Sequence, residues 1–277
     1  MVAAVGSEVD PSTSVGKRVI VRFNAKNGYG SWQEARSVTP HWPARAHHPT
    51  QYVVVSPSHL SSVPDSVSDD AASQFFVNPL TVMAMLDKLN PPPGSFVVQS
   101  AGGSTLGRLM VAMAAKRGVK IISVVRRAEQ ADELLALGAA AVVSSQEDIG
   151  AKVRTITDGA MAWGATDCLA NIMVGRLASA VRRGGSVLVY GALTGMRASV
   201  GVADLMFKDV SIHGFWLGPW LEEQSPHKLD AMTKEVMDSL SDGTLAPSVG
   251  EKFPLAQVAQ AVRVSLQPAR KGKVLLV

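Results

Sequence analysis

The feature that most constrains the fold is a regular alternation of short apolar runs and longer helical stretches after residue 95. Parallel strands need long crossover connections, so this alternation predicts a parallel sheet covered by helices. The sequence therefore predicts an α/β protein with a doubly wound parallel sheet. Strands are expected at residues 96–99, 120–125, 141–143, 166–169, 186–190 and 210–215, helices at 106–116, 129–137, 174–182 and 226–240, and a closing strand at 273–277.

The first 70 residues have a different pattern, with short apolar runs at 18–23 and 52–55 between turn residues. This pattern is typical of β structure. Residues 35–51 have no periodic pattern and contain His41, His47 and His48. A histidine metal cluster is one interpretation of this stretch. We favour the other, an unpatterned insertion, because Pro-rich segments of this kind form no core.

Composition excludes several classes of protein. Lys and Arg number 27 against 23 for Asp and Glu, and the net charge of +4 is dispersed, so no nucleic-acid partner is expected. Cys168 is the single cysteine, which excludes an internal disulfide and a zinc site built from several thiolates. No apolar run approaches the roughly 18 residues of a membrane span, so no membrane partner is expected either. The amino terminus lacks a signal-peptide pattern and is expected to be incomplete.

A glycine-rich turn follows the first strand of the alternating region. It has the sequence Ser100-Ala101-Gly102-Gly103-Ser104-Thr105-Leu106-Gly107 and leads into an apolar helix. Gly102 and Gly107 occupy the outer positions of the G-x-G-x-x-G pattern, and Ser104 replaces the middle glycine. Small residues here let backbone amides approach a pyrophosphate at the helix N-terminus. An ordinary strand-to-helix turn is the alternative.

The end of the next strand indicates which dinucleotide is bound. An NAD-binding chain is expected to carry Asp or Glu about 20 residues after the glycine-rich turn. This chain instead has Arg126 and Arg127. Guanidinium groups hold a 2′-phosphate that a carboxylate would repel, so the pair favours NADPH over NADH. Two solvated arginines at a strand end are the alternative.

From residue 15 onward, several local strings together resemble the medium-chain dehydrogenase/reductase superfamily. Within it, the chain is most similar to the zinc-independent 2-enoyl thioester reductases of mitochondrial fatty acid synthesis. The strings are Gly30-Ser31-Trp32-Gln33-Glu34, Phe76-Val77-Asn78-Pro79-Leu80-Thr81, Gln99-Ser100-Ala101-Gly102-Gly103-Ser104, Val124-Val125-Arg126-Arg127, Phe207-Lys208-Asp209 and Gly214-Phe215-Trp216-Leu217.

The resemblance implies a Rossmann domain together with a partial GroES-like β-barrel catalytic domain. Residues 1–70 would belong to the barrel, with the insertion at 35–51, residues 71–218 to the NADPH-binding domain, and residues 219–277 to the return into the catalytic domain. It also implies that the protein binds no metal, and it indicates which residues contact NADPH. These residues are Asn78, Gly103, Ser104, Thr105, Leu106, Arg126, Arg127, Tyr190, Gly191, Ala192, Leu193, Phe215, Trp216, Leu217, Gly218 and Lys273. Phe215 and Trp216 as core aromatics, and Lys273 as a surface lysine, are the alternatives.

This sequence departs from the family in two places. The catalytic tyrosine of the family lies in an N-terminal motif. The tyrosines of this sequence are Tyr29, Tyr52 and Tyr190, and none of them lies in that motif, so no catalytic residue is assigned. In the family, Glu34 would be followed almost directly by the strand at Tyr52. Residues 35–51 are therefore interpreted as an insertion or a gene-model artefact.

The resemblance implies NADPH-dependent reduction of a trans-2-enoyl thioester carried by acyl carrier protein or coenzyme A. Without the tyrosine motif, we expect NADPH binding with little or no turnover. An NADPH:quinone reductase and a non-catalytic NADPH-binding protein are the alternatives. A homodimer formed through the sheet edge at 200–212 and a mitochondrial location are also expected by resemblance.

Overall fold

The structure is a computed structural model that describes residues 1–2, 15–21, 57, 60–267 and 271–277. The expected strand at 52–55, residues 22–23 of the expected strand at 18–23, and the insertion at 35–51 with its three histidines lie outside the described residues.

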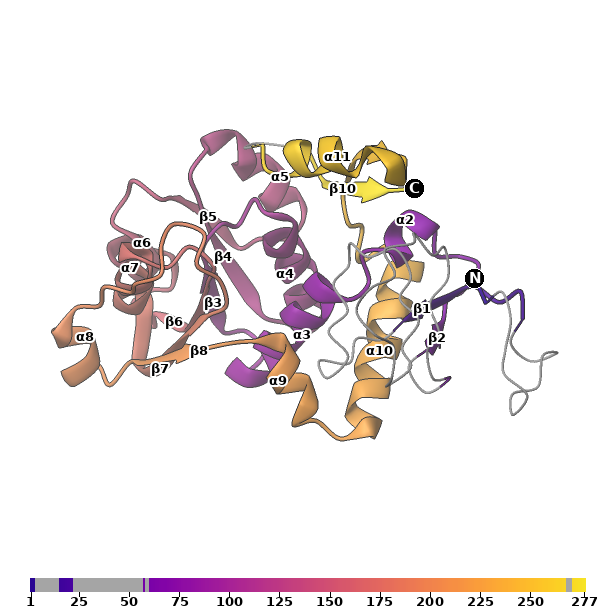
Figure 1. Ribbon diagram of the computed structural model, residues 1–277. Helices are drawn as coiled ribbons and strands as arrows, with labels where there is room; N and C mark the ends of the chain where they lie inside the picture. Colours follow the sequence, from indigo (N-terminus) through magenta and orange to yellow (C-terminus); the bar gives the residue numbers. More distant parts are fainter. Residues whose placement is uncertain (3–14, 22–56, 58–59, 268–270) are drawn as a thin grey trace, which may run out of the picture.

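A six-stranded parallel sheet forms the centre of the molecule, with the strand order β5-β4-β3-β6-β7-β8 (Figure 1). Counted from the first strand of the sheet, this order is 3-2-1-4-5-6, which is the doubly wound Rossmann arrangement. The structure thus confirms the predicted α/β fold. The strands are β3 (Phe96–Gln99), β4 (Lys120–Val125), β5 (Ala141–Ser144), β6 (Ala162–Asp167), β7 (Val181–Val189) and β8 (Ser211–Gly214).

Helices cover both faces of this sheet, as Figure 1 shows. Successive residues of a strand point to opposite faces, and the strands are apolar on both. Val97 accordingly belongs to one buried cluster and Val98 to the other. One face carries α3 (Val77–Leu89), α4 (Thr105–Lys116) and α5 (Ala131–Ala136), which follows the short helix η3 (Ala128–Gln130). The other carries α6 (Ile149–Ile156) and α7 (Ile172–Ala180).

Several expected boundaries were wrong in the middle of the sheet, including that of the strand expected at 186–190, which is β7 and begins at Val181. The strand expected at 166–169 is β6, which begins at Ala162 and ends at Asp167. The Asp167 carboxylate accepts hydrogen bonds from the backbone N–H groups of Leu169 and Ala170, and these turn the chain out of the strand. The helix expected at 174–182 ends at Ala180, and Arg182 is the second residue of the strand β7. Arginine favours helices locally, but pairing with β6 prevails here.

The remaining elements lie around the sheet. The pair β1 (Val19–Val21) and β2 (Leu60–Ser62) is antiparallel, and α2 (Asp69–Ala72) precedes α3. Pro79 lies in the first turn of α3, where a proline is tolerated. The later elements are α8 (Val202–Met206), α9 (Leu217–Glu222), α10 (Pro226–Ser241), β9 (Val249–Phe253), η4 (Leu255–Gln257), α11 (Val258–Ser265) and β10 (Lys273–Leu276).

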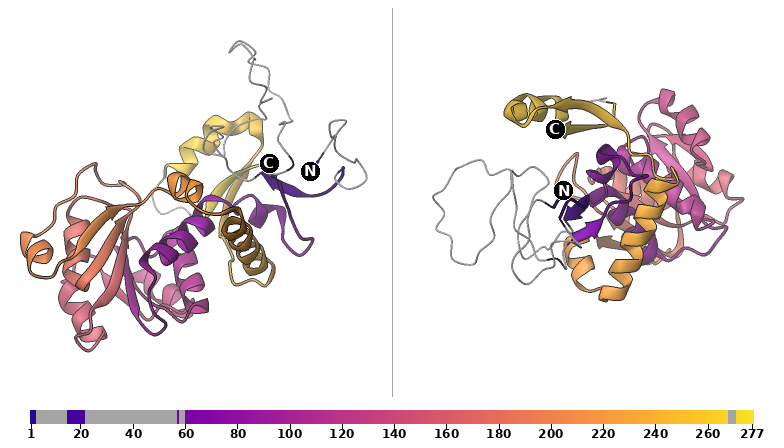
Figure 2. Two further views of the ribbon diagram at one scale, coloured as in Figure 1. Left: turned by 90° about the horizontal axis from the view of Figure 1, so that it is seen from below. Right: turned by 90° about the vertical axis from the view of Figure 1, so that its right-hand side faces the viewer.

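Ion pairs attach these outer elements to the rest of the molecule. Strands β9 and β10 form a separate two-stranded parallel sheet, set apart from the large sheet in all three views (Figures 1 and 2). Lys252 on β9 lies 2.6 Å from the Asp70 carboxylate on α2. Lys116 on α4 lies 3.0 Å from Asp242, the residue that ends α10.

None of the helices in the described residues is long and apolar enough to cross a bilayer.

Candidate functional site

The candidate site lies at the carboxyl edge of the large sheet. All six strands are parallel, so their carboxyl ends share this edge. The chain leaves β3 towards β4 on one side, whereas β6 lies on the other side of β3. Connections that diverge in this way open a crevice at the edge of the sheet, and doubly wound proteins bind ligands there.

The phosphate loop, residues 100–104, connects β3 to α4 at this crevice. Ser104 is the N-cap of α4 in an extended conformation (φ −74°), so this position does not require the glycine of the usual pattern. The Ser104 Oγ accepts a hydrogen bond of 3.0 Å from the N–H of Gly107. The N–H groups of Thr105 and Leu106 also belong to the first helical turn, where no intrahelical acceptor exists. They remain available to bind an anion at the positive end of α4.

Gly102 and Gly107 allow the loop, the helix and the next strand to approach closely. A Cβ on Gly107 would lie 2.3 Å from the carbonyl oxygen of Gly102, and a Cβ on Gly102 would lie 2.6 Å from the Cβ of Ser123 on β4. Neither position can hold a larger residue without movement of the backbone. Close packing therefore explains why glycine occupies both positions of the sequence pattern.

The two arginines lie directly after β4, next to this loop. Arg126 follows the last strand residue, and Arg127 precedes η3 in an extended conformation. The N–H of Gly102 donates a 3.0 Å hydrogen bond to the carbonyl of Val124, so the loop and the end of β4 are in contact. Both arginines are exposed, and among the described residues neither forms an ion pair. Two unpaired guanidinium groups next to an anion-binding loop can hold a second phosphate.

A polar row crosses the ends of the next strands. The backbone N–H of Cys168 donates to the Ser100 Oγ (3.2 Å), and the N–H of Tyr190 donates to the Asp167 carbonyl (2.8 Å). Burial raises the pKa of the Cys168 thiol, although the hydrogen bond from the Tyr190 hydroxyl opposes this. Burial also raises the pKa of Tyr190 well above its ordinary value. Both groups are therefore neutral near pH 7, and the Cys168 thiol is buried.

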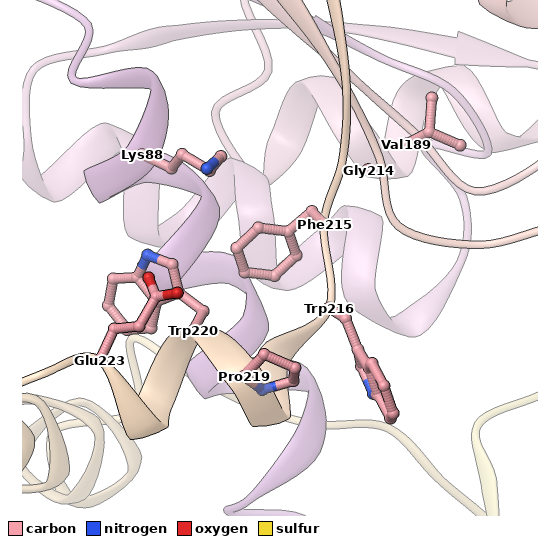
Figure 3. A pocket seen from close by; sticks show the side chains of 8 residues that line it. All are labelled: Lys88, Val189, Gly214, Phe215, Trp216, Pro219, Trp220 and Glu223. Atoms are coloured by element: carbon pink, nitrogen blue, oxygen red, sulfur yellow. The ribbon is translucent and has the colours of Figure 1, made fainter.

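A cleft of about 400 Å³ lies beyond this row, at the ends of β7 and β8. It is lined by Lys88, Val189, Gly214, Phe215, Trp216, Pro219, Trp220 and Glu223 (Figure 3). The centroids of the Phe215 and Trp220 rings are 6.5 Å apart. Phe215 is a core aromatic, whereas 78% of Trp216 is exposed and its indole points away from that pair in Figure 3. The core interpretation therefore holds for Phe215 and is wrong for Trp216.

The sixteen predicted contact residues fall into separate groups in space. Gly103, Ser104, Thr105 and Leu106 lie beside Arg126 and Arg127, as described above. Residues 190–193 run along the end of β6, with the N–H of Leu193 bonded to the Cys168 carbonyl (3.0 Å). Leu217 and Gly218 begin α9 below the cleft, and Asn78 lies half-buried in the first turn of α3. Lys273 is on β10, outside the large sheet.

Three residues of the site were not assigned from the sequence. The Gln99 Nε2 donates to the carbonyl of Gly107 (2.9 Å) and to the Ser123 Oγ (3.0 Å), beneath the phosphate loop. Gln130 lies against Gly103, with 3.5 Å between its Nε2 and the Gly103 carbonyl oxygen. Gln99 and Ser123 are polar residues in apolar strands, a signal that could have identified them. Gln130 has no such signal, because a polar residue is ordinary in a turn between a strand and a helix.

The described part of the chain gathers no group of three His, Cys, Asp or Glu side chains that could hold a metal. The fold and the phosphate loop instead define the class of Rossmann-fold dinucleotide-binding proteins.

Comparisons with known proteins agree with this class. Residues 105–235 match the family model described as zinc-binding dehydrogenase. The mitochondrial enoyl-[acyl-carrier-protein] reductase of Homo sapiens is 28% identical over 229 residues, which cover 80% of this chain and 61% of the human one. The Mus musculus enzyme is 30% identical over 230 residues, with the same coverage of 80% and 61%.

Among solved structures, a Bacillus thuringiensis protein described as an NADPH:quinone reductase matches with a TM-score of 0.84 and 27% identity. The match covers 98% of this chain and 76% of that one. The chain is thus similar, over most of its length, to known dehydrogenases and reductases. It spans about three fifths of the length of the human and mouse relatives, with 61% covered in each.

Proposed function

We propose that the chain is an NADPH-binding member of the medium-chain dehydrogenase/reductase superfamily, related to its 2-enoyl thioester reductases, with little or no turnover of its own. The observation that carries the proposal is the pair of exposed arginines directly after β4, a strand whose Val124 carbonyl is hydrogen-bonded to the phosphate loop, together with loop glycines that leave no room for a Cβ. The residues fit the dinucleotide at two points that are independent of each other. One holds a pyrophosphate, and the other distinguishes NADPH from NADH.

The pyrophosphate would be held by the backbone of Gly103, Ser104, Thr105 and Leu106. The first-turn amides of α4 face the ligand without a net charge of their own, and the helix dipole adds attraction for an anion. The segments 190–193 and 215–218 follow β7 and β8 at the same edge of the sheet, as expected for contacts to the rest of the dinucleotide. Asn78 and Lys273 are proposed contacts on the resemblance alone.

The 2′-phosphate would lie between Arg126 and Arg127. Guanidinium groups donate several hydrogen bonds to phosphate oxygens in a planar geometry, and each such charged bond contributes about 1.5–3 kcal/mol. NADH has a hydroxyl at this position and gains little from either arginine. We therefore expect selectivity for NADPH to come from these two residues.

NADPH, when bound, supplies hydride, and the protein orients the acceptor next to it. Names of relatives support an enoyl thioester as that acceptor, carried by acyl carrier protein or coenzyme A. Tyr190 is the single tyrosine in the described part of the chain, and its hydroxyl donates to Cys168. A group engaged in this way, with a raised pKa, is a poor replacement for the tyrosine of the family motif. We expect the 277-residue chain to bind NADPH but to reduce enoyl thioesters poorly or not at all.

Reduction of a quinone is the second candidate function. It is favoured by the similarity to the Bacillus thuringiensis structure, which extends over 98% of this chain. Steady-state assays with a crotonyl thioester and with a quinone separate the two reactions. Binding of NADPH with neither activity would favour the third possibility, a non-catalytic cofactor-binding protein.

The decisive experiment is a fluorescence titration of the chain with NADPH and NADH. We expect tighter binding of NADPH, and we expect an Arg126→Ala/Arg127→Ala variant to lose about a hundredfold or more in NADPH affinity. Arg154→Ala/Arg183→Ala is the matched control, because it removes two exposed arginines elsewhere on the surface. A folded chain that binds neither dinucleotide would refute the proposal.

We also propose that two copies associate through the β8 edge of the large sheet. Among the described residues no strand pairs with the outer side of β8, and α8 beside it leaves Phe207 72% exposed and Met206 68% exposed. Unpaired backbone groups and apolar side chains at an edge favour pairing with another strand. Light scattering should give twice the monomer mass, and Phe207→Glu should reduce it. A monomeric wild-type chain would contradict this arrangement.

Two further proposals concern the whole chain. The names of relatives support a mitochondrial location. We also propose that residues 71–218 form the NADPH-binding unit, with 1–70 and 219–277 as parts of a catalytic unit. The separate small sheets β1–β2 and β9–β10 support this division.

A further inference from the structure

The side chain of Gln130 packs directly on Gly103 of the phosphate loop. A Cβ on Gly103 would lie 2.0 Å from the Gln130 Nε2 and 2.4 Å from its Cδ. The Nε2 also lies 3.5 Å from the Gly103 carbonyl oxygen, within reach of a long hydrogen bond. Gly103 is therefore the position at which the loop makes room for the amide of Gln130, and the amide in turn limits how far the loop can move.

Gln130 ends the segment that carries the two arginines. This segment leaves β4 after Val125, and at its start the Val124 carbonyl accepts the N–H of Gly102 (3.0 Å). At its end, the N–H of Gln130 donates to the Arg127 carbonyl (3.2 Å) in the turn of η3, and the side chain returns to the loop. The arginine segment is thus attached to the phosphate loop at both ends.

Such an attachment matters for a ligand with two separated phosphate groups. Arginine side chains are long. Ordering them, and the segment that carries them, costs conformational entropy and therefore weakens binding. A segment already fixed against the phosphate loop presents its guanidinium groups at a set distance from the pyrophosphate site. This preorganisation benefits a dinucleotide with a 2′-phosphate and is of little consequence for one without it.

We propose that Gln130 is a positioning residue that couples the two arginines to the phosphate loop and thereby sets the selectivity for a 2′-phosphate. The proposal rests on the proposed binding of NADPH. Gln130 has no charge, and its Nε2 lies against the Gly103 carbonyl oxygen. Its contribution acts through Arg126 and Arg127, so it should disappear when these are removed.

The test measures dissociation constants of NADPH and NADH by fluorescence titration for Gln130→Ala in two backgrounds. In the wild-type background, we expect NADPH binding to weaken about three- to tenfold and NADH binding by less than about twofold, the range of one lost hydrogen bond. In the Arg126→Ala/Arg127→Ala background, we expect the same substitution to change neither constant by more than about twofold. Gln257→Ala is the matched control, an exposed glutamine in the short helix η4.

A second variant tests the contact from the other side. Gly103→Ala should displace the Gln130 amide and weaken NADPH binding more than NADH binding. In a Gln130→Ala background, the added Gly103→Ala should cost less, because the amide that it would strike is gone. Unequal costs in the two backgrounds support direct coupling, whereas equal costs contradict it.

The remaining outcomes distinguish the inference from the proposed function. Equal weakening of NADPH and NADH by Gln130→Ala would show that Gln130 only stabilises the phosphate loop, and no weakening would show that it has no role. Either result overturns the inference but leaves NADPH binding intact if the arginine variant loses affinity. A wild-type chain that binds neither dinucleotide overturns both.

Discussion

Gly107 lies where α4 passes closest to the phosphate loop, and replacing it by alanine tests whether this closeness maintains the site. The added Cβ would lie 2.3 Å from the Gly102 carbonyl oxygen and 2.9 Å from that of Ala101. Both are backbone atoms, so no side chain can rotate away, and the helix and loop must separate by about 1 Å. The 2.9 Å hydrogen bond from the Gln99 Nε2 to the Gly107 carbonyl would lengthen as well.

We expect Gly107→Ala to lower the free energy of unfolding by about 1–3 kcal/mol, the usual cost of overpacking. Affinity for NADPH and NADH should fall together, because the pyrophosphate is common to both. Denaturation in urea, together with the fluorescence titration, measures the two effects. Gly201→Ala is the control, since Gly201 has an ordinary backbone (φ −67°) and only an Asp204 Oδ2 at 3.4 Å near its Cβ position. Unchanged stability and affinity in Gly107→Ala would refute the packing argument.

Three other variants or treatments test local interactions. Ser104→Ala should lower the free energy of unfolding by about 1 kcal/mol through loss of the N-cap, whereas Ser104→Thr should retain most of it; equal urea midpoints for Ser104→Ala and wild type would contradict this. Hydrogen bonds from Thr244 and Lys116 hold the pKa of Asp242 at about 2, below its ordinary 3.8. A lowered pKa stabilises the folded state above pH ~4, and this contribution disappears as the pH falls through about 2. Asp242→Asn should therefore be less stable than wild type at pH 6 and equal to it near pH 2, and a gap that persists at pH 2 would argue against the assignment. Cys168 is buried and the pKa of its thiol is raised, so at pH 8 a thiol reagent should label the native chain slowly and the urea-unfolded chain rapidly, and rapid labelling of the native chain would be inconsistent with its burial.

Local patterns predicted the elements wherever each segment had one strong preference. The strands at 96–99 and 120–125 have the predicted bounds, because dense runs of Val and Ile favour a strand in isolation. The start of β6 was missed because Ala162, Gly164 and Ala165 form no such run, and neighbouring strands supply their pairing. The same dependence on a partner strand moved Arg182 from an expected helix to β7.

The sequence by itself determined the alternation that produces a parallel sheet, the glycine-rich turn after its first strand, and the arginine pair after its second. Each is a local property, set by side-chain periodicity or by the residues of one turn. Only the tertiary structure decided which atoms meet across the chain. It brought Gln130 onto Gly103, Tyr190 to Cys168, and the Gly107 backbone to Gln99. Such contacts depend on strand order and helix packing, which arise from burial summed over the whole core and leave no pattern in a single segment.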